Sequence, residues 1–359
     1  MRRVAVTGVG VLGGAVAGGS DAVRAFLARA PGGAAPRAVV RAAGRSTAEA
    51  SGEMPRAVPA ATLSALIDEG EARRLSRACQ LSVGAARLAL ADAGLGPGRD
   101  LGLVVGTEFG DLRSTIEFVN GYLRRGPGGL SPLLFPNTVM NTMAAAAAIA
   151  VTARELSLTL NAPTVAGELA VARATALVRA GRAPAVLAGG MDQLDPVLLE
   201  ALAELGGGDA RAEGAGFVVL ETLDAARARG ARVLGEIAGA AWRALPARPY
   251  GVGRRPAASG AIAAALADAR VAPGEVGSVQ LSAAGDVLRD RWEQALVEAA
   301  LGAHRPRTAA LGPVVGRHSG LVALAVAAAA ADAGAAGAPA LVHAVARGGS
   351  EVCLVVTGP

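Results

Sequence analysis

Lysine is missing from this 359-residue sequence, so all 35 of its basic side chains are arginines. The arginines occur singly or in pairs, and aromatic residues make up only 3% of the chain. Binding to nucleic acid requires clustered basic residues, commonly with aromatics that stack on bases, so the pattern argues against that function. A formal net charge of +5 leaves an acidic protein partner open.

Cysteine and histidine are scarce in the sequence. The longest apolar run, 321–340, is mostly alanine and contains Asp332, so it predicts a buried helix and not a membrane span. The cysteines and histidines show no spacing typical of metal ligands, so we expect no metal site. They are Cys79, Cys353, His304, His318 and His343. The first six residues are typical of a strand and not of a signal peptide. We therefore expect a cytoplasmic protein without membrane association.

Alanine, valine and leucine dominate the 52% of residues that are hydrophobic. Short valine-rich runs alternate with helical stretches, which predicts an α/β fold. The expected strands are 3–7, 101–105, 156–160, 185–187, 216–220, 232–237, 278–281, 340–345 and 351–356. The expected helices are 72–93, 110–123, 167–180, 259–267 and 289–301, and segment 32–60 is expected to be irregular. Each half opens and closes with a strand, which suggests duplicated halves in a layered sandwich around buried, alanine-rich helices.

A glycine motif, G-x-G-x-x-G, occupies residues 8–13 directly after the first predicted strand. A dinucleotide-binding site would also need an acidic residue about 20 positions further on, at the end of the next strand. The next strand-like run, 37–41, does not end in an acid. The motif therefore predicts a structural turn, and an NAD-dependent oxidoreductase remains the weaker alternative.

Four segments together resemble the β-ketoacyl synthases. They are 4–10 (VAVTGVG), 131–139 (SPLLFPNTV) followed by Asn141, 179–192 (RAGRAPAVLAGGMD) and 214–221 (GAGFVVLE). The resemblance covers nearly the whole chain, is weakest over residues 30–70, and implies the thiolase fold. It also implies two halves of one compact unit, residues 1–225 and 226–359.

The resemblance fails at the positions that carry the family's chemistry. Synthases use a cysteine thiolate at a helix N-terminus, and the residue in that place is Thr164. Their two catalytic histidines are replaced by Ser282 and Arg317, although His318 stands one position later. Asp290 matches a family aspartate and is expected to cap or pair structurally.

These departures resemble the chain-length factors, subunits that partner an active ketosynthase in type II polyketide synthases. Segments 281–285 (LSAAG), 316–317 (GR) and 346–349 (ARGG) carry this resemblance. It implies a non-catalytic subunit that forms a heterodimer and shapes the acyl tunnel. The substrates would be carried on the phosphopantetheine of an acyl carrier protein, with no other cofactor. The shortened loop before residue 214 favours reduced, polyene-type products.

The resemblance also assigns candidate residues to three surfaces. Tunnel candidates are Phe109, Leu112, Ile116 and Leu133. The edge strand at the expected twofold axis comprises Ser157, Leu158, Thr159, Leu160 and Asn161. Arg124 and Arg125 are expected at an exposed turn that could steer an acidic carrier protein. For each group an ordinary core, strand or solvated loop is the alternative.

A second function stays open: a thiolase-fold acyltransferase that uses Thr164 as its nucleophile. Val165 and Ala166 follow Thr164, so no neighbouring serine could replace it. The sequence does not indicate the starter unit, the chain length or the partner's identity.

Overall fold

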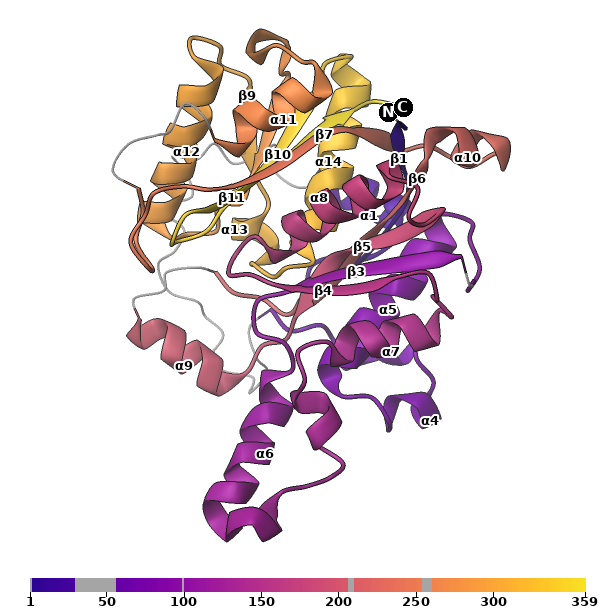
Figure 1. Ribbon diagram of the computed structural model, residues 1–359, viewed down its shortest axis with the longest axis vertical. Coiled ribbons are helices and arrows are strands. Elements are labelled where there is room, and N and C mark those ends of the chain that lie inside the picture. Colours follow the sequence, from indigo (N-terminus) through magenta and orange to yellow (C-terminus); the bar gives the residue numbers. More distant parts are fainter. Residues whose placement is uncertain (1, 30–55, 99, 206–209, 254–259) are drawn as a thin grey trace.

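A computed structural model describes residues 2–29, 56–98, 100–205, 210–253 and 260–359. Most of segment 32–60 and the run 37–41 therefore lie outside the described residues. In the described part, eleven strands form a single sheet with helices on both faces (Figure 1). None of the described helices has the length and apolarity needed to cross a membrane.

The N-terminal half contributes five strands in the order β4-β3-β5-β6-β1, with the short β2 (Ala17–Gly18) beside β1. They are β1 (Val4–Gly13), β3 (Leu101–Thr107), β4 (Ser157–Asn161), β5 (Ala185–Asp192) and β6 (Gly214–Thr222). Strand β3 is parallel to β4 and β5, whereas β6 is antiparallel to β5 and β1. Strand β4 forms one edge of the sheet.

The C-terminal half repeats this arrangement in the order β7-β11-β10-β8-β9. Its strands are β7 (Gly235–Ala244), β8 (Ser278–Leu281), β9 (Arg307–Ala310), β10 (Ala340–Val345) and β11 (Ser350–Thr357). Strand β8 is parallel to β9 and β10, and β11 is antiparallel to β10 and β7. The same order and directions in both halves agree with the predicted duplication.

Two helices form the layer between the halves: α8 (Ala166–Arg179) and α14 (Leu321–Ala336). Helix α8 contacts β3 and β5 of its own half and also β7 and β11, while α14 contacts β10 and also β1 and β6. Small alanine side chains allow this close packing on both faces, as expected for a buried helix. The layered thiolase-like fold predicted from the sequence is confirmed.

The other described helices lie around this core, and α5 and α11 among them pack on the outer faces of the two halves (Figure 1). They are α1 (Ser20–Arg29), α3 (Ala60–Ser64), α4 (Glu69–Ala72), α5 (Arg77–Asp92), α6 (Leu112–Arg125), α7 (Thr142–Ala150), α9 (Pro196–Glu204), α10 (Leu223–Ala228), α11 (Ala261–Ala269), α12 (Val287–Leu301) and α13 (Gly312–Val315). The described residues also include the 3-10 turns η2 (Gly126–Gly129), η3 (Phe135–Thr138) and η4 (Pro273–Glu275). Helix α6 and its turn project from one end of the molecule.

The predicted turn at residues 8–13 is wrong, because β1 runs without interruption to Gly13. Gly8 and Gly10 lie where β1 crosses α5 at very short range. A Cβ added to Gly10 would lie 2.3 Å from the backbone nitrogen of Ala89. The glycines are therefore required by close helix–strand packing and not by a phosphate-binding turn.

Candidate functional site

Thr164 lies just before α8, in the segment that follows the carboxyl end of β4. Parallel α/β sheets place their sites at this end of the strands. The φ angle of Thr164 is 69°, a left-handed conformation that is rare for a β-branched residue. The side chain is buried beside a pocket. Such backbone strain is typical of functional positions.

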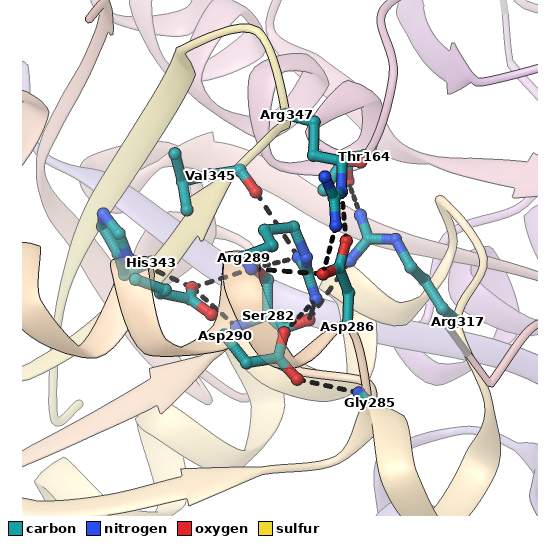
Figure 2. A network of polar contacts seen from close by, with 11 residues as sticks. Thr164, Ser282, Gly285, Asp286, Arg289, Asp290, Arg317, His343, Val345 and Arg347 are labelled. Atoms are coloured by element: carbon teal, nitrogen blue, oxygen red, sulfur yellow. Dashed lines mark hydrogen bonds and ion pairs between the residues drawn. The ribbon is translucent and has the colours of Figure 1, made fainter. Parts of the chain in front are cut away.

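Arg317 connects the positions that resemble the family's catalytic residues. Its guanidinium donates one hydrogen bond to the carbonyl oxygen of Thr164 and another, 3.1 Å long, to that of Ser282. The residue is 5% exposed, so the charge lies within the protein. Figure 2 shows Arg289 and Arg317 converging on Ser282. The structure thus brings Thr164, Ser282 and Arg317 together.

Arg289 is a second buried arginine at this place, and sequence reasoning missed it. It is 1% exposed, and it donates to the Ser282 hydroxyl (3.0 Å) and carbonyl (3.1 Å). It also pairs with Asp290 at 2.7 Å. Asp290 in turn accepts from the backbone nitrogen of Gly285, so it pairs structurally as predicted. Two guanidinium groups therefore fix the Ser282 segment.

Glu293, on α12, lies behind Ser282 and begins a buried polar chain. Its Oε1 accepts from the Ser282 backbone nitrogen (2.9 Å) and hydroxyl (2.8 Å), and lies 3.1 Å from Nδ1 of His343. The other ring nitrogen of His343 lies 3.0 Å from Oε1 of Glu351. Burial by itself lowers the pKa of His343, but the hydrogen bonds to the two carboxylates outweigh it and raise the pKa to about 9. The ring is thus an imidazolium that donates to both.

Glu168, on α8, and His318, which follows Arg317 in the sequence, are both buried within reach of the Arg317 charge. Burial raises the pKa of Glu168 to about 7, although the charge of Arg317 opposes the shift. Burial, aided by Arg317, lowers the pKa of His318 to about 4, so its ring is neutral. The ring of His318 packs against Gly214, where an added Cβ would lie 2.5 Å from Cε1.

A pocket of about 510 Å³ opens next to Thr164. Its inner wall contains Glu108, Arg211, Asp286, Arg289 and Arg347, and its outer wall contains Leu202, Leu205, Pro249 and Tyr250. Arg347 pairs with Asp286, and Arg211 pairs with Glu108 while lying 5.4 Å from the ring of Phe109. Among the described residues, no group of three or more His, Cys, Asp or Glu side chains is arranged to hold a metal ion.

The tunnel candidates separate into two places. Ile116 and Leu133 line a second, larger pocket between α6 and the start of α9. Phe109 precedes α6, which begins at Leu112 and not at residue 110, and it packs under Arg211. Leu133 is 88% exposed. A tunnel role for these residues stays a prediction.

The docking candidates line that pocket, and the interface candidates form the edge strand β4. Strand β4 pairs with β3 on one side, and Ser157, Leu158 and Asn161 are exposed. Arg124 and Arg125 are exposed, but they end α6 instead of following it. As the last turn of a helix, they lie where cations interact favourably with the helix dipole. Their proposed roles stay predictions.

Comparisons with known proteins identify the family. The sequence model of the β-ketoacyl synthase N-terminal domain matches residues 1–226, and that of the C-terminal domain matches residues 234–346. The chain is 33% identical to the "Putative polyketide beta-ketoacyl synthase 1" of Streptomyces virginiae and 28% identical to the "3-oxoacyl-[acyl-carrier-protein] synthase 2" of a Synechocystis strain. Each match covers 66% of this chain but only 64% of the relative.

Solved structures share the fold over the full chain. "The ishigamide ketosynthase/chain length factor" superposes with a TM-score of 0.82 at 23% identity and covers 100% of this chain and 99% of that chain. A type II polyketide synthase acyl-carrier protein in complex with its ketosynthase, bound to the hexaketide, gives 0.77 at 20% identity, with both chains covered completely. The resemblance drawn from the sequence motifs is confirmed. The chain belongs to the β-ketoacyl synthase family.

Proposed function

We propose that the chain is a non-catalytic subunit of the chain-length-factor type, which pairs with an active ketosynthase in a type II polyketide synthase. The observation that carries the proposal is the position of Arg317. Its guanidinium holds the carbonyl groups of Thr164 and Ser282, where synthases of this family would need a reacting thiolate and an imidazole.

The chemistry of the site supports an inert subunit. Condensation needs a nucleophile that becomes acylated and groups that stabilise an oxyanion. Arginine does not release its proton in proteins, so Arg317 is unable to act as a base for Thr164. The two cysteines, Cys79 and Cys353, are buried in α5 and β11, and burial raises the pKa of both thiols. Neither supplies a thiolate.

The surface around β4 supports a large protein interface. Exposed apolar side chains gather on α6, α7, β4 and the segment between α6 and α7: Val119, Tyr122, Leu123, Leu130, Leu133, Phe135, Val139, Met140, Ile149 and Leu158. Ile149 is 80% exposed. Soluble monomers rarely leave an apolar surface of this extent uncovered. The name of the ishigamide neighbour, a ketosynthase/chain length factor, agrees with a ketosynthase as the occupant.

The substrates of such a complex would arrive on the phosphopantetheine arm of an acyl carrier protein. The acyl-carrier-protein complex among the similar structures supports this assignment. The pocket that Ile116 and Leu133 line also contains Arg124 and Arg125. Once a partner covers this face, the pocket would lie at the interface between the subunits. Its depth would then limit the length of the growing acyl chain.

The strained backbone of Thr164 favours one competing function, an acyltransferase with a threonine nucleophile. The φ angle of 69° strains the backbone of this β-branched residue, and the surrounding structure must compensate for the strain. Strained backbone of this kind is often found at catalytic nucleophiles. The alternative needs a base for the hydroxyl, whereas the contact from Arg317 goes to the backbone carbonyl and leaves the hydroxyl proton in place. We therefore rank it second.

Intact-protein mass spectrometry separates the two functions. The chain is co-purified with its ketosynthase and incubated with acyl and malonyl carrier-protein thioesters. A non-catalytic subunit keeps its mass while the partner gains an acyl group, and Thr164→Ala leaves product formation within about twofold. An acyl adduct on Thr164, or loss of products in Thr164→Ala, would contradict the proposal. Failure to co-purify with any ketosynthase would contradict the heterodimer.

A further inference from the structure

Trp242 is the exposed one of the two tryptophans in this chain, which has few aromatic residues. It lies on β7 and is 38% exposed, whereas Trp292 is 6% exposed and packs in the core. The guanidinium group of Arg173, on α8, lies 5.4 Å from the centre of the Trp242 ring. This distance is within the range of a cation–π interaction. Two elements that are distant in sequence therefore form one site on the surface.

Two arginines meet at this ring, and neither has an acidic partner among the described residues. Arg173 lies over the ring, and Arg243 donates a hydrogen bond to the carbonyl oxygen of Trp242 at 2.9 Å. We call Arg173, Trp242 and Arg243 the Trp242 patch. Tryptophan and arginine are the residues most enriched at the centres of protein interfaces. The patch combines an exposed ring with two positive charges, so its chemistry fits an acidic side chain of another protein.

The patch is fixed in place by a second arginine of α8. The guanidinium group of Arg179 pairs with Asp268, on α11, at 2.6 Å. The same group donates hydrogen bonds to the carbonyl oxygens of Ile237 and Ala238, on β7. These contacts hold α8 and β7 in one arrangement before any partner binds. Less entropy is therefore lost when the patch is covered.

The patch lies beside the edge strand of the sheet. Helix α8 contacts both β4 and β7, and it lies between them in Figure 1. Although α8 belongs to the central layer, Arg173, Ala176 and Ala180 are exposed. These residues are spaced by three and four positions, so they share one side of the helix. This exposed side connects β4 to the Trp242 patch.

Strand β4 (Ser157–Asn161) contains no charged residue, so it does not distinguish a ketosynthase from a second copy of this chain. The Trp242 patch is charged and can make this distinction. We propose that the patch binds an acidic side chain of the ketosynthase partner and so selects this partner over a second copy. The inference rests on the heterodimer proposed above. A pair of identical chains would contain the patch twice, which adds like charge to the interface.

Fluorine NMR of the full chain labelled with 5-fluorotryptophan tests the contact. The chain contains two tryptophans, and Trp242→Phe assigns their two signals. Addition of the unlabelled ketosynthase should shift the Trp242 signal and remove its sensitivity to D₂O, while the signal of the buried Trp292 stays unchanged.

The outcomes separate this inference from the proposed function. An unchanged Trp242 signal in a complex that elutes as a heterodimer would overturn the inference and leave the proposed function intact. If no complex forms with the ketosynthase, both are overturned. A Trp242 signal that shifts with the concentration of the chain alone would show that a second copy covers the patch.

Matched charge reversals test the acidic partner. Arg173→Glu should weaken binding to the ketosynthase by about tenfold or more, measured by surface plasmon resonance. Arg227→Glu reverses an exposed arginine on α10 and should weaken binding by less than about twofold. Arg173→Lys keeps the charge over the ring and should stay within about threefold of wild type.

Circular dichroism checks that each variant is folded. Equal losses in Arg173→Glu and Arg227→Glu would show that binding responds only to total charge, and the inference would be wrong. If Arg173→Glu does not fold, the fluorine signal of the wild-type chain decides, because that measurement needs no substitution at the patch.

Discussion

Replacing His343 with glutamine tests whether a buried cation stabilises the C-terminal half. The ring lies on β10 between Glu293 and Glu351, at 3.1 Å and 3.0 Å, and its side chain is fully buried. Its pKa is about 9, against an ordinary value of 6.5. One pKa unit corresponds to about 1.4 kcal/mol, so proton binding contributes about 3 kcal/mol to the free energy of unfolding.

The pH dependence of this stabilisation follows from the direction of the pKa shift of His343. Because the pKa in the folded state lies above its unfolded value, the contribution is complete below about pH 6.5 and disappears as the pH rises through about 9. His343→Gln lacks this proton at every pH. The difference in unfolding free energy between wild type and His343→Gln should therefore shrink by about 3 kcal/mol from pH 6.5 to pH 10.

Urea unfolding followed by circular dichroism at pH 6.5, 8 and 10 measures this difference. Glu351→Gln and the double variant provide the control, because the double variant should cost clearly less than the sum of the two single ones. A difference that is the same at pH 6.5 and pH 10 would refute a buried imidazolium. Additive single variants would refute the pairing with Glu351.

Three further predictions concern packing, chain length and carrier docking. Gly10→Ala should destabilise the fold by about 1–3 kcal/mol, because the added Cβ forces β1 and α5 apart. Thermal or urea unfolding measures this loss. Gly96→Ala is the control, because no atom lies within 4 Å of its new Cβ, and it should not destabilise the fold. Ile116→Trp fills the pocket near α6, so an active complex should release shorter carrier-bound products by mass spectrometry; unchanged lengths would argue against a measuring role. Arg124→Glu with Arg125→Glu should slow carrier-protein association at low salt and have little effect at high salt, measured by stopped flow; the same rate at both salt concentrations would exclude steering.

Local patterns predicted most of the strands and several of the helices, such as α5, α8 and α12, because each of these carries its own periodicity. Shorter helices such as α9 and α10 were not predicted. The glycines of β1 show the limit of this reasoning. In the sequence, Gly8 and Gly10 suggest a turn. In the structure, glycine is required at both positions because the backbone of α5, about 80 residues away in sequence, leaves no room for a Cβ. Strand β9 was missed because Arg307 and Thr308 leave only two buried alanines to mark it.

The candidate site was predictable only where the family motifs reach. Thr164, Ser282 and Arg317 were found by their place in those motifs and do lie together. The burial of Arg289 could not be predicted, because an arginine in a helix with several charged residues is normally exposed to solvent. His343 stands in an apolar strand and could have been noticed, but its partner Glu293 lies 50 residues earlier, and only the folded chain brings the two into contact.

The shared central layer has a consequence for how the chain folds during synthesis. Helix α8 needs β7 and β11 to cover it, and β1 and β6 need α14, so neither half completes its core alone. Strand β11 ends at Thr357, so it covers α8 only after the ribosome has released residues up to about 357. Until then the nascent N-terminal half exposes an alanine- and valine-rich surface. The dependence on contacts distant in sequence predicts slow folding and a need for chaperone protection at elevated expression rates.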